Sequence, residues 1–189
     1  MLTETHKNQK TFSNIMEAFS YPGRLVSLEP SQSYRGNLYP YTIDLALCLL
    51  DGEVSLHVVD TDQVALQEIQ IRTNVKDGSL EDADYVIFSL EKNDQVKDSL
   101  GRQKKGTLIN PQLSATTIIE VEELSKAKDL VLTGPGIKDQ NYLSIGKADW
   151  LDQRRLINED FPLGLDILLV DKSGNLVALP RTTEIRVGE

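Results

Sequence analysis

The sequence predicts an α/β fold: a single-domain layered mixed sheet with helices on its faces. Three observations lead to this prediction. Short β-branched runs alternate with helical patterns through most of the 189 residues, two apolar runs flank a turn-rich loop near the carboxyl end, and no repeat, linker or low-complexity segment divides the chain. A chain of this length buries roughly 70% of its unfolded surface in one core. We therefore expect one domain over residues 1–189.

An amphipathic pattern near the amino terminus predicts a helix over residues 11–20. Thr11 is available as its N-cap, and Pro22-Gly23 can stop it. The apolar residues that share one face at helical spacing are Phe12, Ile15, Met16 and Phe19.

A second, buried helix is expected over residues 41–50, with Gly52 ending it in a left-handed conformation. Residues 54–59 alternate as a strand, and Asp62 then opens another helical stretch. The residues that share a helix face are Ile43, Leu47 and Leu50 in the first helix, and Leu66 and Ile69 in the second.

The rest of the chain predicts further strands and one helix. The β-branched and aromatic runs expected to be strands are 85–90, 117–121 and 130–132. Residues 167–170 and 176–179 flank a short loop and predict an antiparallel hairpin, and 184–187 can add a final strand. The helix expected over about 148–158 rests on Trp150, Leu151, Arg154 and Ile157.

Composition excludes several classes of protein. Twenty Lys and Arg against 29 Asp and Glu give a net charge of −9, which disfavours binding to nucleic acid or to an anionic membrane. The amino terminus lacks the apolar core of a signal peptide, and the longest apolar run, 45–50, is too short to span a bilayer. The single cysteine, Cys48, lies in that run, so we expect a buried, inert thiol and a cytoplasmic protein.

Gly134, Pro135 and Gly136 follow an apolar run and form the first candidate site. Glycines can let backbone N–H groups approach a phosphate or phosphonate oxygen, whereas Pro135 removes one donor. The segment is neither a P-loop nor a dinucleotide fingerprint. Two interpretations stay open here: a tight structural turn, or a loop that contacts a ligand.

Arg181, Thr182 and Thr183 form the second candidate site, because a guanidinium beside two hydroxyls can hold an oxyanion. The alternative is that Arg181 pairs with Asp166 in a structural ion pair. Asp166 enters an apolar run and must be paired or hydrogen-bonded, either to hold the loop at Gly164 or to take part in catalysis.

The remaining polar residues give no recognisable catalytic triad, carboxylate dyad or metal site. His57 is expected to be half-buried or at an interface. The only basic cluster, 97–105, is expected to be a solvated loop, with docking on an acidic partner or nucleotide as the alternative. We expect no metal and no cofactor.

Four segments in fixed order resemble the H subunit of the bacterial carbon–phosphorus lyase system, which breaks down phosphonates. They are Phe12 to Gly23, Leu130 to Ile137, Phe161 to Val170 and Leu179 to Thr183. The resemblance implies a fold similar to the large domain of PLP-dependent transferases, but without PLP. It also implies a homodimer that joins the other subunits of a complex in phosphonate catabolism.

That complex exchanges the adenine of ATP for a phosphonate and makes ribose 1-methylphosphonate 5-triphosphate. The resemblance implies that a larger partner supplies the chemistry and that this chain alone is not catalytic, with ATP or the phosphonate as candidate ligands at a subunit interface. Two alternatives stay open: an independent enzyme or binding protein for a small phosphorylated ligand, and a scaffold that binds no ligand. A deep pocket where Gly134-Pro135-Gly136 and Arg181-Thr182-Thr183 converge would favour the former, and a tightly packed junction the latter.

Overall fold

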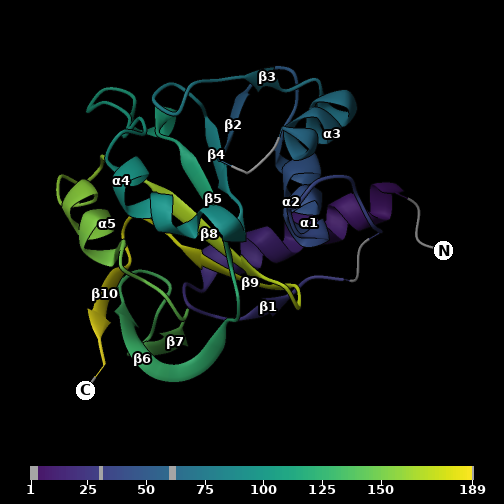
Figure 1. Cartoon of the computed structure of the whole chain (residues 1–189). Helices are drawn as coiled ribbons and strands as arrows, with labels where there is room; N and C mark the ends of the chain where they lie inside the picture. The colour runs from purple at the N-terminus through teal and green to yellow at the C-terminus, as the bar shows by residue number, and fades with distance from the viewer. Residues whose placement is uncertain (1–3, 30–31, 60–62, 189) are drawn as a thin grey trace.

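The computed structural model describes residues 4–29, 32–59 and 63–188, which form a central sheet covered on both faces (Figure 1). The helices are α1 (Glu4–Ser20), α2 (Pro40–Leu49), α3 (Val64–Thr73), α4 (Val96–Leu100) and α5 (Leu151–Ile157), with 3₁₀ turns η1 (Leu90–Gln95) and η2 (Pro111–Leu113). The strands are β1 (Val26–Ser27), β2 (Ser55–Val59), β3 (Lys76–Asp77), β4 (Tyr85–Phe88), β5 (Thr116–Val121), β6 (Ser125–Thr133), β7 (Asn141–Ser144), β8 (Asp166–Asp171), β9 (Asn175–Leu179) and β10 (Glu184–Val187).

The central sheet has seven strands in the order β1-β9-β8-β5-β4-β2-β3. Strands β3, β2, β4, β5 and β8 are parallel, whereas β9 is antiparallel to β8 and to β1. A second sheet has the order β10-β6-β7 and is antiparallel throughout. The predicted mixed α/β architecture and the β8–β9 hairpin are confirmed.

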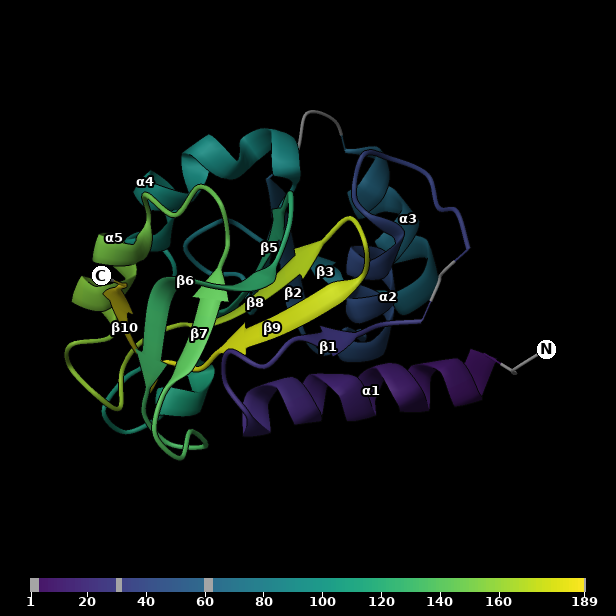
Figure 2. The ribbon, with the colours of Figure 1, turned by 90° about the horizontal axis from the view of Figure 1, so that it is seen from below.

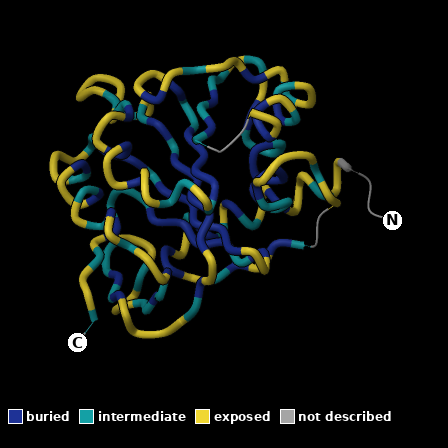
Figure 3. The backbone as a smooth tube through the Cα atoms, in the orientation of Figure 1, coloured by how far each residue is buried: buried dark blue, intermediate teal, exposed yellow. Residues whose placement is uncertain are grey.

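Alternation along the central strands divides the core into two apolar clusters, one on each face of the sheet. On one face Leu56, Ile87 and Ile118 pack with the helices α1 to α3. On the other, Phe88 and Ile119 pack with α4, α5 and the small sheet. Figure 2 shows these layers from the side of α1, and Figure 3 shows the central strands buried between them. Two-residue alternation explains both clusters, because successive side chains point to opposite faces.

Helix α1 corrects the prediction made for residues 11–20. The helix begins at Glu4, so Thr11 lies inside it and is buried rather than acting as an N-cap. The shared apolar face is also divided: Ile15 is buried, but Phe12 is 52% exposed and Met16 49% exposed. The i, i+3, i+4 spacing predicted the helix correctly, because it reports helical periodicity. It does not report how much of the helix face the neighbouring elements cover.

Other boundaries differ in smaller ways. Helix α2 ends at Leu49, the following residue Leu50 is extended, and Gly52 does not have the left-handed backbone expected of it. Helix α3 buries Leu66 and Ile69 as predicted, while the proposed start at Asp62 lies outside the described residues. Strand β6 begins at Ser125, five residues before the expected start. The prediction missed this part of the strand because its amino-terminal half is exposed and lacks an apolar pattern.

Candidate functional site

Three segments far apart in the sequence meet where the two sheets adjoin the end of α1. They are the corner at residues 21–24, the β6–β7 loop at residues 134–140 and the turn at residues 180–183. Figure 2 shows the end of α1 lying beside the small sheet. We call this meeting place the junction.

The corner is tied to both sheets by its backbone. Gly23 has a φ of +78° and donates its N–H to the carbonyl of Ala178 in β9. Asn141 in β7 donates its side-chain N–H to the carbonyl of Pro22, at 2.7 Å. A Cβ on Gly23 would lie 2.7 Å from the Leu132 side chain. A side chain at this position is therefore excluded both by the backbone conformation and by the neighbour.

The β6–β7 loop opens with a tight turn, as the structural interpretation predicted. Ile137 donates its N–H to the carbonyl of Gly134, and Gly136 has a φ of +82°. Proline at the second position and glycine with positive φ at the third are typical of a type II turn. A Cβ on Gly136 would lie 2.5 Å from the carbonyl oxygen of Ser20. The turn thus sits directly against the end of α1.

Gly134 faces the opposite way and packs on the turn at residues 180–183. Its φ is +131°, and a Cβ there would lie 2.8 Å from the carbonyl oxygen of Thr182. Thr183 donates its N–H to Pro180, which closes the second turn, and is buried. The two predicted segments therefore converge and pack directly on each other, with the backbone of Gly134 against that of Thr182.

All the side-chain N–H donors of Arg181 form contacts within the protein. Its Nε and one Nη contact the carboxylate of Asp166, at 3.3 and 2.6 Å, and this confirms the structural pairing. The other Nη donates to the carbonyls of Pro111 and Pro162, both at 3.1 Å, and the remaining N–H contacts Ser114. A guanidinium has five N–H donors, so every one of them is occupied.

Asp166 is likewise occupied, because its Oδ1 also accepts the backbone N–H of Arg181 at 2.7 Å. The loop before it is held close: Gly164 has a φ of +140° and lies between Asn158 and Arg181. Asp166 thereby links the loop before β8 to the turn after β9. The proposed pinning of the Gly164 loop agrees with these contacts.

A second guanidinium, which the sequence interpretation treated only as part of a helix, holds the same turn from α5. Arg154 is 4% exposed and donates to the carbonyls of Pro180 at 2.7 Å and Thr183 at 3.0 Å. Burial lowers its pKa to about 10, although the charge of Asp166 acts in the opposite direction. An arginine at the inner positions of an amphipathic helix was the signal that could have identified it.

A cavity of about 460 Å³ opens on the other side of the β6–β7 loop, between that loop and the corner. Its lining residues are Tyr21, Gly23, Arg24, Lys126, Gly136, Ile137, Lys138, Gln140, Asn141 and Tyr142. Three of these side chains are cationic, and none of the described residues in the lining is acidic. Of the predicted site residues, only Gly136 reaches this cavity.

Two aromatic rings hold cations at the rim of the cavity. The Arg24 guanidinium lies 5.4 Å from the centroid of Tyr21, and the Lys128 ammonium lies 4.8 Å from that of Tyr142. Arg24 also pairs with Glu17, at 3.2 Å. Both rings therefore position positive charge beside the cavity, as cation–π contacts do.

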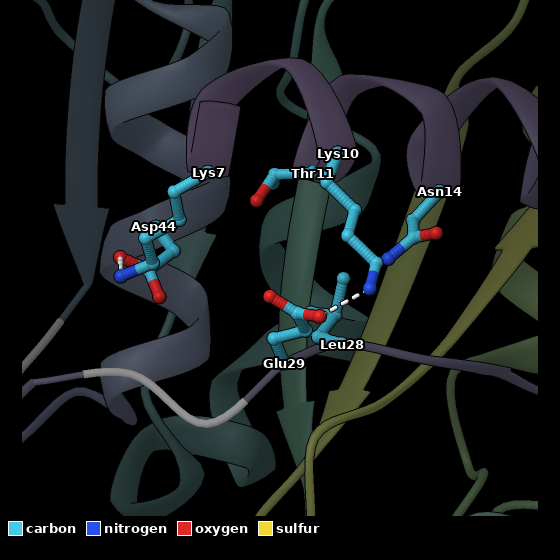
Figure 4. Close-up of a pocket in the computed structure, with 7 residues that line it drawn as sticks. All are labelled: Lys7, Lys10, Thr11, Asn14, Leu28, Glu29 and Asp44. Carbon is cyan, nitrogen blue, oxygen red and sulfur yellow. Dashed lines mark hydrogen bonds and ion pairs between the residues drawn. The ribbon is translucent and has the colours of Figure 1, made fainter. Parts of the chain in front are cut away.

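A second hollow, between α1, α2 and the segment after β1, has a volume of only about 10 Å³. Figure 4 shows that its cations point at carboxylates: Lys7 at Asp44, at 2.7 Å, and Lys10 at Glu29. Asp44 also accepts a hydrogen bond from Tyr34. A space of this size holds at most one water molecule. Its charges are internal pairs rather than a ligand site.

Two buried carboxylates that the sequence interpretation did not single out stand near the carboxyl ends of parallel strands, where open α/β sheets usually bind ligands. Glu120 accepts hydrogen bonds from Thr42 at 2.7 Å and from the backbone of Leu90 at 3.1 Å. Asp171 accepts backbone N–H groups of Leu124 and Ser173, at 3.0 and 2.9 Å. These carboxylates hold helix and loop ends in place. An acid within an apolar run was the available signal.

The other predicted residues have local roles. His57 is half-buried, as expected, and its Nδ1 lies 2.9 Å from the carbonyl oxygen of Gly78. Cys48 is half-buried rather than buried, and burial raises the pKa of its thiol. The prediction of a solvated loop for the basic cluster is wrong in part, because residues 97–100 lie in α4 and Gln103 is buried on Thr117. Lys104 pairs with Asp84.

The described residues contain neither a cluster of metal ligands nor a helix that could span a membrane. No group of three or more His, Cys, Asp or Glu side chains is placed to hold a metal ion in that part of the chain. None of its helices is both long and apolar enough to cross a membrane.

Comparison with known proteins gives a match over nearly the whole chain. The model of the family described as bacterial phosphonate metabolism protein (PhnH) matches residues 2–186. HtxG of Stutzerimonas stutzeri, named as a C-P lyase subunit protein, is 35% identical over 185 residues, which cover 96% of this chain and 87% of HtxG. The alpha-D-ribose 1-methylphosphonate 5-triphosphate synthase subunit PhnH of Rhizobium meliloti (strain 1021) is 27% identical over 181 residues, which cover 94% of this chain and 89% of that subunit.

Proposed function

We propose that the chain, which belongs to the family of bacterial phosphonate metabolism proteins (PhnH), is a subunit of the carbon–phosphorus lyase complex in phosphonate catabolism. The observation that carries this proposal is the family match over residues 2–186, supported by two relatives named as subunits of that system. Both relatives align over most of their own length, so the similarity extends across the whole fold.

The reaction that the complex is proposed to perform is the exchange of the adenine of ATP for a phosphonate. The N-glycosidic bond at C1 of the ribose breaks, a phosphonate oxygen forms the new bond to C1, and adenine leaves with a proton. The triphosphate at C5 is kept. We propose that this chain supports the exchange and that partner subunits supply the groups at C1, since Arg181 and Asp166 are occupied with each other.

Reconstitution tests this proposal. The tagged chain is expressed with and without the other subunits, and release of adenine from ATP in the presence of methylphosphonate is measured. We expect copurification with the partners, no adenine release by the chain alone, and loss of adenine release when this chain is omitted. Release by the isolated chain would instead support an independent enzyme. Full activity of the complex without it would refute the proposal.

We further propose that the isolated chain is a homodimer. Large apolar side chains that the single chain leaves exposed, such as Ile109 at 88% and Phe161 at 67%, are consistent with association. Sedimentation equilibrium at micromolar concentration should give twice the chain mass of 21.1 kDa. A species of 21.1 kDa would contradict the dimer without affecting family membership.

Two further proposals concern fold relationship and location. We propose that the central sheet is related to the large domain of PLP-dependent transferases and that the chain uses no PLP. Spectra recorded with added PLP should show no Schiff base. We also propose a cytoplasmic location, which a half-buried, unpaired Cys48 supports, and which cell fractionation tests.

A further inference from the structure

The lining of the large cavity differs in charge from the rest of this acidic protein. Arg24, Lys126 and Lys138 contribute three cations to one cavity, although the chain as a whole carries a net charge of −9. Asp139 follows Lys138 in the loop but is not among the lining residues. The local field in the cavity therefore favours an anion, which the global charge would repel.

The cations differ in their availability. Arg24 is shared with Glu17, whereas Lys126 and Lys138 have no ion-pair partner within the part of the chain that the structure describes. Both lysines are exposed, and their charges cost little to maintain in water. A multivalent anion that bridges them would gain several charge-assisted hydrogen bonds at once.

The size of the cavity favours a phosphate ester over a simple anion. The side-chain amides of Asn141 and Gln140 already bind Pro22 and Tyr142, but the cavity volume of about 460 Å³ lies within the range of pockets that hold a small molecule. The cavity is therefore large enough for an oligophosphate together with an attached sugar.

We propose that this cavity, between the corner at residues 21–24 and the β6–β7 loop, binds the 5-triphosphate group of a ribosyl triphosphate, with Lys126 and Lys138 as its main contacts. The inference rests on the proposed function, because the exchange keeps the triphosphate on the ribose throughout. Substrate and product would then be held by the group they share, while C1 faces the partner subunits.

Isothermal titration of the full chain with inorganic tripolyphosphate, ATP and adenosine tests the site. Tripolyphosphate and ATP should each bind saturably at one site, and adenosine should not bind. Lys126→Gln and Lys138→Gln should each weaken binding about fivefold, as expected for loss of an exposed charge contact, and the double variant about 25-fold. Lys147→Gln is the matched control, because Lys147 is exposed and lies outside the cavity.

The site would be overturned by no binding of tripolyphosphate or ATP, by unchanged affinity in the double variant, or by equal weakening in Lys147→Gln. Adenosine binding as tight as that of ATP would assign the cavity to the base instead. Copurification of the double variant with the partner subunits separates this inference from the proposed function. A variant that assembles but binds no triphosphate supports the site, whereas failure of the wild-type chain to assemble refutes the function alone.

Discussion

The two sides of the Gly134-Pro135-Gly136 turn both carry cationic side chains, but these side chains differ in whether the protein itself occupies them. On the closed side, Gly134 packs on the turn at 180–183, and Arg181 spends all five of its donors on the protein. On the open side, Gly136 borders a cavity whose lysines have no carboxylate in the lining. A basic residue beside a glycine-rich loop is therefore not by itself a ligand contact. Its neighbouring acids and carbonyls decide whether its charge is free.

The largest expected effect comes from breaking the turn that separates the two sides. Gly136→Val places a β-branched side chain at a φ of +82° and 2.5 Å from the carbonyl of Ser20. Positive φ and the clash together should lower the free energy of unfolding by about 3 kcal/mol. Denaturant unfolding measures the loss.

Gly146→Val provides a matched comparison, because Gly146 also has a positive φ, +65°, but no atom lies within 4 Å of a Cβ there. It should lose only the conformational part, about 1–2 kcal/mol. Equal losses in the two variants would mean that the contact between the turn and α1 contributes nothing.

Removing the guanidinium of the closed side should have the next largest effect. Arg181→Ala removes the guanidinium partner of Asp166 and of two carbonyls, which should cost about 2–3 kcal/mol, below the fully buried case because Asp166 keeps 23% side-chain exposure. Arg181→Lys keeps the positive charge but loses the bidentate geometry of the guanidinium. Its free energy of unfolding should therefore lie between those of the wild type and Arg181→Ala.

The matched change, Arg186→Ala, removes an exposed arginine 3.4 Å from Glu184 and should have almost no effect on thermal unfolding. Triphosphate binding to Arg181→Lys should stay at the wild-type level under conditions where the variant is folded. If Arg181→Lys kept the wild-type melting temperature but lost triphosphate binding, Arg181 would be a ligand contact rather than a structural residue.

The ion pair between Lys104, in the basic cluster, and Asp84 tests a case of intermediate exposure. Burial opposes charge on Asp84, but hydrogen bonds from Lys104 and Ser55 outweigh it and lower its pKa below the ordinary 3.8. A lowered folded-state pKa stabilises the protein above the unfolded value, and this stability is lost as pH falls through the folded one.

Because Asp84 and Lys104 are about one third exposed, with side-chain exposures of 34% and 27%, solvent screening should limit the effect to less than about 1 kcal/mol. Wild type should therefore lose slightly more stability between pH 5 and pH 3 than Asp84→Asn, as measured by urea unfolding at each pH. Asp149→Asn is the control. An identical pH profile for wild type and Asp84→Asn would remove Asp84 from the set of stabilising pairs.

The smallest expected effect on stability is at the open side. Lys126→Gln should change the free energy of unfolding by less than about 0.5 kcal/mol, because Lys126 is exposed and has no ion-pair partner within the described residues. Thermal unfolding without ligand measures this. A loss comparable to that of Arg181→Ala would show that Lys126 holds structure, and the contrast between the two sides would disappear.

Periodicity in the sequence was enough for the elements and for the fold class. Two-residue alternation placed β2, β-branched and aromatic runs placed β4 and β5, and helical spacing placed α1, α2 and α5, because each pattern reports a local geometry. The tight turn at Gly134 to Ile137 was one of two interpretations that the sequence left open, and it agrees with the tendency of proline followed by glycine to form a turn within four residues. The pairing of Arg181 with Asp166 was one of two interpretations that the sequence left open.

Tertiary structure alone decided which charges are available. Arg154 became a buried clamp on a turn 26 residues away, and Glu120 became a partner of Thr42 across 78 residues. Exposure of Phe12 was also decided at this level, because only the neighbouring layers determine how much of a helix face is covered. The cavity is lined by Tyr21 and Tyr142, which come from distant parts of the chain. Local patterns specify backbone geometry, whereas a side chain's desolvation and partners depend on contacts between distant segments, which exist only after the chain has folded.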